Sequence, residues 1–143
     1  MLFRSLLIKQ DVFSQLESLL EENAILATNT SSIDLNEMGS VLKRPERFVG
    51  MHFFNPAPVM ALVEVVQSTE TDSEVADMVF SLAEHWGKSP VHVCSSPGFI
   101  VNRVARPFYS EALAILKEGG TDAVTCDTIM RECGGFRMGK EMR

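Results

Sequence analysis

The chain has 143 residues, 45% of them hydrophobic, which is enough for one globular domain with a core or for parts of two domains. Its formal net charge of -6 excludes a general electrostatic attraction to nucleic acid or to anionic membranes, because both need a basic surface. The longest apolar runs are far shorter than the roughly 20 residues that cross a bilayer. We therefore expect a soluble protein with no nucleic-acid or membrane partner.

Helical and extended patterns alternate through the first two thirds of the chain. Helices are indicated by apolar side chains at helical spacing, and strands by short runs of β-branched and aromatic residues. In chain order we predict a helix over 11–22, a strand over 24–28, a short helix over 34–42, strands over 48–54 and 60–66, a helix over 73–87 and a strand over 89–94. This alternation is typical of an α/β sheet with crossover helices.

The pattern changes at Pro97 and Gly98, after which the chain is predicted to be helical. A long helix over 99–120 contains Pro107, which predicts a kink. Thr121 is a candidate N-cap for a second helix, which would stop at the glycine pair 134–135. We predict a domain boundary between residues 96 and 97. Two helices cannot close a core, so we expect both ends of the chain to be cut edges of a larger protein.

The three cysteines match neither a disulfide framework nor a metal clip. We expect Cys94, Cys126 and Cys133 to be reduced thiols that behave as small buried hydrophobic groups, which indicates a cytoplasmic protein, and we predict no metal site.

A histidine and a glutamate stand in two otherwise apolar runs of the predicted hairpin, residues 48–54 and 60–66. His52 and Glu64 lie at equal distances from Pro58, so a hairpin folded about that proline places them opposite each other on one face. Glu64 would then accept a hydrogen bond from one imidazole nitrogen and leave the other as a base. The alternative is a satisfied core histidine beside a tolerated charge, and hairpin geometry alone leaves it open.

Four sequence blocks resemble the NAD-dependent 3-hydroxyacyl-CoA dehydrogenase family and occur in its order and at its spacing. They are "NTSS" at 29–32, "HFFNPAPVMALVEVV" at 52–66, "PGFIVNR" at 97–103 and "GFRMG" at 135–139. The histidine block is highly specific, whereas "NTSS" alone would be weak. The resemblance spans roughly residues 9–139 and implies an oxidoreductase of fatty acid metabolism that uses NAD and an acyl-CoA substrate.

The resemblance assigns roles to seven residues. His52 matches the family's general base, which takes the proton of the substrate 3-hydroxyl while a hydride passes to the nicotinamide, and Glu64 matches the residue that orients it. Ser31 matches a serine that contacts substrate and cofactor. The remaining matches are Asn102, which would polarise the substrate carbonyl, Asn55, which contacts substrate or only serves its loop, and Asn29 and Lys9, which would lie near the cofactor.

The resemblance also implies a fold, and it shows that one motif of the family is missing from these 143 residues. It implies the C-terminal half of a Rossmann-type nucleotide-binding domain, residues 1–96, followed by the start of an all-helical dimerisation domain, residues 97–143. The family's GxGxxG fingerprint, which would cradle the cofactor pyrophosphate, does not occur. We therefore expect an inactive fragment with exposed hydrophobic faces that is prone to aggregate. The intact enzyme is expected to be a homodimer.

Two further functions remain open. A non-catalytic structural or interaction protein on this scaffold would tolerate replacement of His52 and Glu64. A dehydrogenase of a small hydroxy acid without CoA would prefer the free acid to its thioester.

Overall fold

A computed structural model describes residues 5–135, and their contacts divide the chain into two compact units, Met1–Ile100 and Val101–Arg143. The boundary predicted between 96 and 97 falls in the loop that joins these units. Most of the "GFRMG" block, 135–139, lies outside the described residues.

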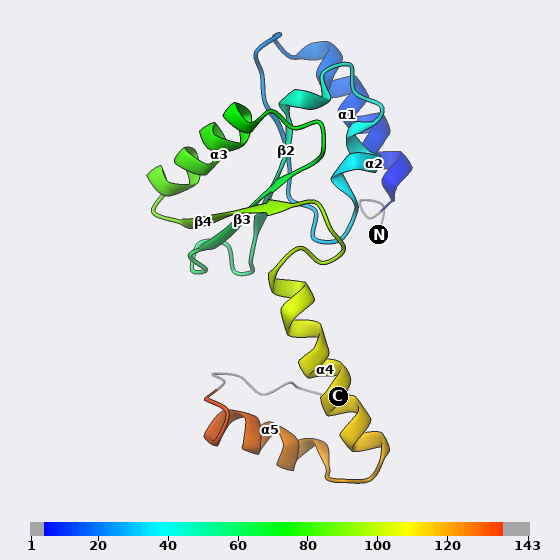
Figure 1. Ribbon diagram of the computed structural model, residues 1–143, viewed down its shortest axis with the longest axis vertical. Coiled ribbons are helices and arrows are strands. Elements are labelled where there is room, and N and C mark those ends of the chain that lie inside the picture. Colours follow the sequence, from blue (N-terminus) through cyan, green and yellow to red (C-terminus); the bar gives the residue numbers. More distant parts are fainter. Residues whose placement is uncertain (1–4, 136–143) are drawn as a thin grey trace. The chain divides into compact units, whose positions relative to one another are not determined.

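The first unit contains one four-stranded sheet in the order β1-β2-β3-β4 (Figure 1). Its strands are β1 (Leu26–Thr28), β2 (Phe48–Phe53), β3 (Leu62–Gln67) and β4 (Ser89–Cys94). The pairs β1–β2 and β3–β4 are parallel, while β2 and β3 form an antiparallel hairpin. The predicted hairpin is therefore confirmed, and all four predicted strands form.

Helices cover both faces of this sheet (Figure 1). One face packs against α1 (Leu6–Leu19) and α2 (Leu35–Gly39), and the other packs against α3 (Ser73–His85). Successive strand residues point to opposite faces. Phe48 accordingly packs in the cluster with the first two helices, whereas Val49 packs in the cluster with α3.

Gly50 of β2 allows close packing within the sheet. A Cβ atom added there would lie 2.7 Å from the Cβ of Val66 on β3. Only glycine fits this position without movement of the neighbouring strand.

The first helix differs from its prediction in position and in burial. It begins at Leu6, not Asp11, and of the predicted apolar stripe only Phe13 is buried. Hydrophobic spacing marks a helix face, but it does not establish that another element covers that face. Over the described residues, no helix combines the length and the apolar character needed to span a membrane.

The second unit consists, within the described residues, of α4 (Val101–Lys117) and α5 (Ala123–Glu132). Pro107 lies inside α4, as expected. The N-cap of α5 is Asp122, not Thr121, because the Asp122 carboxylate accepts the backbone N–H of Thr125. That same bond, together with one from the Thr125 hydroxyl, lowers the pKa of Asp122.

The prediction of three buried cysteines is wrong for two of them. Cys126 is buried, but Cys94 and Cys133 are exposed. Cys94 ends β4, which is an edge strand, and Cys133 is the C-cap residue of α5, so neither position has packing on all sides.

Candidate active site

His52 and Glu64 form a buried pair across the hairpin. The antiparallel register places them directly opposite each other, and His52 Nδ1 lies 2.7 Å from Glu64 Oε2. Glu64 is 0% exposed and His52 is 6% exposed. This distance is that of a hydrogen bond between the imidazole and the carboxyl group. The predicted juxtaposition is therefore confirmed.

The second carboxylate oxygen of Glu64 is also bound. The backbone N–H of Ile100 donates to Glu64 Oε1 over 3.0 Å. A buried carboxylate loses the stabilisation of water, and hydrogen bonds to both of its oxygens offset part of that loss. The pair is thus held by three segments: β2, β3 and the loop before α4.

The pairing fixes which imidazole nitrogen can act as a base. An ionised Glu64 accepts only, so the neutral imidazole carries its proton on Nδ1 and leaves the Nε2 lone pair available. This is the arrangement of a general base with an orienting carboxylate.

Aromatic rings surround the imidazole. The ring of Phe54 lies 4.7 Å from the His52 ring, and that of Phe99 lies 5.7 Å away in a T-shaped arrangement. Phe99 is 2% exposed and belongs to the core cluster of α1 and α2. These apolar neighbours exclude water from the pair and strengthen its hydrogen bond.

The chain matches two successive domains of one protein family. The 3-hydroxyacyl-CoA dehydrogenase NAD binding domain matches residues 2–96, and the C-terminal domain of 3-hydroxyacyl-CoA dehydrogenase matches residues 98–140. The chain belongs to the 3-hydroxyacyl-CoA dehydrogenase family. The expected fold is thereby confirmed as a Rossmann-type α/β unit followed by a helical unit.

Curated relatives support the same family. The chain is 48% identical over 132 residues to 3-hydroxyadipyl-CoA dehydrogenase from Escherichia coli K12, and 45% identical over 132 residues to 3-hydroxybutyryl-CoA dehydrogenase from Clostridioides difficile. Each match covers 92% of this chain, but 28% and 47% of the relatives. The chain thus spans less than half the length of these two relatives.

A solved structure of a similar protein also matches the fold of this chain. Crystalline 3-hydroxybutyryl-CoA dehydrogenase from Escherichia coli K12 superimposes with a TM-score of 0.91 at 47% identity. The match covers 94% of this chain and 29% of that one.

The "NTSS" loop of this family member lies at the same edge of the sheet as His52. Strands β1 and β2 are parallel, so the loop after Thr28 and the end of β2 meet at their carboxyl edge. Asn29 connects the two, since its Oδ1 accepts the backbone N–H of Phe53 over 2.8 Å. Ser31 is exposed two residues further on. The structure therefore brings Asn29 close to the segment that carries His52.

The other three predicted residues lie in three different segments of the chain. Asn55 is exposed in the loop after β2, and Lys9 is half-buried in α1. Asn102 lies in the first turn of α4, in the second unit. Their roles stay predictions.

Sequence reasoning missed three further groups that contact the pair. The Phe54 ring directly follows β2, whereas the Phe99 ring and the Ile100 amide come from the loop before α4. The one available signal was the Pro97-Gly98 dipeptide, which favours a tight turn and so fixes the course of the chain just before Phe99.

Asp34 connects the loop after β1 to the end of β4. Its side chain caps α2 by accepting the N–H of Asn36, and it accepts the Ser95 hydroxyl over 2.7 Å. Partial burial acts to raise the pKa of Asp34, but the hydrogen bonds from Ser95 and Asn36 together lower it below its ordinary value.

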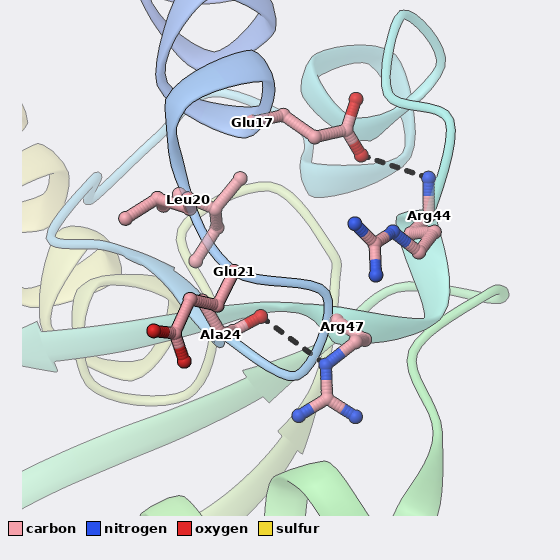
Figure 2. A pocket seen from close by; sticks show the side chains of 7 residues that line it. Glu17, Leu20, Glu21, Ala24, Arg44 and Arg47 are labelled. Atoms are coloured by element: carbon pink, nitrogen blue, oxygen red, sulfur yellow. Dashed lines mark hydrogen bonds between the residues drawn. The ribbon is translucent and has the colours of Figure 1, made fainter.

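A charged pocket lies at the amino ends of β1 and β2, away from His52 (Figure 2). Glu17 accepts the backbone N–H groups of Lys43 and Arg44, and Arg47 Nε donates to the carbonyl of Ala24. The free volume is about 10 Å³, room for at most one water molecule. These bonds join α1 and the loop after it to the segment before β2, and the cavity between them has no space for a substrate.

Proposed function

We propose that this chain carries the proton-transfer site of an NAD-dependent 3-hydroxyacyl-CoA dehydrogenase. The intact enzyme would oxidise an (S)-3-hydroxyacyl-CoA to the 3-oxoacyl-CoA. The observation that carries this proposal is the buried pair of His52 and Glu64, whose nitrogen and oxygen atoms lie 2.7 Å apart. Family membership supports the choice of reaction.

His52 would act as the general base. Its Nε2 lone pair accepts the proton of the substrate 3-hydroxyl, and the resulting imidazolium is stabilised by the Glu64 carboxylate. Bound NAD would supply the acceptor for the hydride that leaves C3. In the reverse direction the imidazolium returns its proton to the carbonyl oxygen.

Other polar groups would bind the substrate and the cofactor. We assign Ser31 to both, because its loop lies at the sheet edge where β2 delivers His52, and Asn29 to the nicotinamide end of the cofactor. Asn102 and Asn55 would contact the substrate, and Lys9 the cofactor. Since the 143 residues contain no GxGxxG motif, we assign to this chain no contact with the pyrophosphate.

The proposal also covers the localisation, the oligomeric state and the binding partners of the enzyme. The intact protein would be a cytoplasmic homodimer that binds acyl-CoA and neither nucleic acid nor membrane, with residues 97–143 beginning its dimer-forming helical domain. The net charge of -6 supports the proposal that the protein binds neither nucleic acid nor membranes.

A chimera tests the proposed reaction. The matching 132-residue segment of the Escherichia coli 3-hydroxyadipyl-CoA dehydrogenase is replaced by this chain's residues, and consumption of NADH is followed with acetoacetyl-CoA. We expect turnover, and a loss of about 10²-fold or more in kcat for His52→Gln, the range of general-base catalysis. His92→Gln is the matched control, because His92 is an exposed histidine on β4.

The same assay separates the alternatives. A correctly folded chimera without turnover, beside an active parent enzyme, would contradict the proposal. Equal activity of the His52→Gln and unmodified chimeras would favour a non-catalytic scaffold role. A preference for free 3-hydroxybutyrate over its CoA thioester would identify a dehydrogenase of small hydroxy acids.

A further inference from the structure

We infer that Phe99 and the backbone amide of Ile100 are positioning groups for the His52–Glu64 pair. This inference rests on the proposed function, but it concerns the loop of residues 95–100, between β4 and α4. In this loop, one backbone conformation places the Phe99 ring against the imidazole and directs the Ile100 N–H to the carboxylate. The loop thereby shields the pair from water and orients it.

The backbone of Phe99 is the first observation. Its φ is +50°, and among the described residues it is the one non-glycine residue with a positive φ. This region is disfavoured for residues with a Cβ atom, and a bulky side chain there is an outlier. Such an arrangement persists only where the surroundings require it, and it clusters at functional sites.

A tight turn leads into this conformation. The N–H of Phe99 donates to the carbonyl of Ser96 over 3.0 Å, and Gly98 has a φ of +79°. Proline is common at the second position of a type II turn, and glycine is favoured at the third, where φ is positive. The turn alone would accept glycine at 99, so the aromatic side chain must meet a separate requirement.

The contacts of the loop show what that requirement is. The centroid of the Phe99 ring lies 5.7 Å from that of the His52 ring in a T-shaped arrangement, and Phe99 is 2% exposed. The next amide, of Ile100, donates to Glu64 Oε1 over 3.0 Å, while Glu64 Oε2 faces His52. Because the peptide plane between 99 and 100 follows the backbone angles of Phe99, one conformation sets both contacts.

The start of the loop is anchored independently. The Ser95 N–H donates to the carbonyl of Gln67, and its hydroxyl donates to Asp34 Oδ1 over 2.7 Å. Ser95 Oγ also accepts the N–H of Leu35. The loop is therefore fixed to β3 and to the start of α2 before it reaches the pair.

Nuclear magnetic resonance of the His52 side chain tests the inference in the 143-residue chain, without turnover. The variants are Phe99→Leu and Phe13→Leu. Both remove an aromatic ring from the same core cluster, but Phe13 packs on Phe48 and not on His52. The readouts are the exchange of the His52 Nδ1 proton with water and the nitrogen shifts that report the tautomer.

We expect the exchange to become about tenfold faster or more in Phe99→Leu, because water reaches the pair, and to stay within about twofold in Phe13→Leu. The nitrogen shifts should show a second tautomer in Phe99→Leu only. If Phe99→Leu does not fold, Phe99→Met, whose flexible side chain fills more of the space, is measured in the same way.

Two results would overturn the inference: an unchanged His52 signal in the Phe99 variant, or equal changes in both variants, which would make Phe99 an ordinary core residue. In the active chimera, Phe99→Leu should lower kcat more than it raises KM. An inactive chimera with the expected resonance changes would contradict the proposed reaction and leave the positioning role intact.

Discussion

At the scale of single residues, the pair of His52 and Glu64 dominates the candidate site because both side chains are buried. Glu64 is fully buried between two valines of β3, where an ionised group is costly unless it is hydrogen-bonded. The imidazole and the Ile100 amide each bind one of its oxygens. The stability of the hairpin and the chemistry of the site therefore depend on the same contacts.

Removing the imidazole should destabilise the chain strongly. In His52→Leu the buried carboxylate loses its imidazole partner, and we expect a loss of about 3–5 kcal/mol in the free energy of unfolding, measured by urea denaturation. Glu64→Gln should cost less, because it carries no charge and keeps an oxygen for the Ile100 amide. His85→Leu, at an exposed position in the last turn of α3, should change stability by less than about 0.5 kcal/mol. Equal losses at 52 and 85 would contradict this account of the pair.

At the scale of elements, the short helix α2 depends on Asp34. Five residues form a helix too short to be stable by itself, so its cap and its packing decide whether it forms. Asp34 caps it and also bonds Ser95, which connects this helix to the loop that reaches Glu64.

The contribution of Asp34 should depend on pH. Asp34→Ala should cost about 1 kcal/mol at neutral pH through loss of the cap, whereas Asp34→Asn keeps a capping oxygen. Because the pKa of Asp34 is lowered in the folded chain, its charge stabilises the fold above the ordinary value of 3.8, and this contribution is lost as the pH falls through the lowered value.

Urea unfolding of the wild type and of Asp34→Asn at pH 7 and near pH 2.5 measures this effect. The difference between the two proteins should shrink at the lower pH. A difference that stayed constant would show that the charge of Asp34 does not contribute.

At the scale of the whole molecule, burial is distributed unequally between the two units. The first contains both core clusters, with fully buried residues on β2, β3, α2 and α3. In the described part of the second, only Ala112 and Cys126 are buried. Its helices also expose large apolar side chains, among them Val104, Leu113 and Val124.

Amide hydrogen exchange should reveal this inequality. Protection follows the free energy of local opening, which is low where few apolar groups are buried. We expect the amides of Val49 and Val65 to exchange slowest and those of α4 and α5 to exchange at least about tenfold faster. Mass spectrometry of peptides after timed exchange measures both, and equal protection of the two units would contradict the prediction.

The sequence by itself determined the elements and the central pairing. Alternation of apolar runs predicted each strand, and equal distances from Pro58 predicted the register that sets His52 opposite Glu64, because strand pairing about a turn depends on local chain geometry alone. The family resemblance rested on motifs of the same local kind, and family membership is confirmed.

Only the tertiary structure decided which of these elements are covered and what else reaches the pair. The apolar face of α1 and the exposure of Cys94 depend on neighbours that spacing does not reveal. The contacts of Phe99 and Ile100 join residues far apart in the chain through a backbone conformation that hydrophobic patterns do not encode. Local periodicity thus fixed the hairpin, whereas long-range packing fixed the surroundings of its histidine.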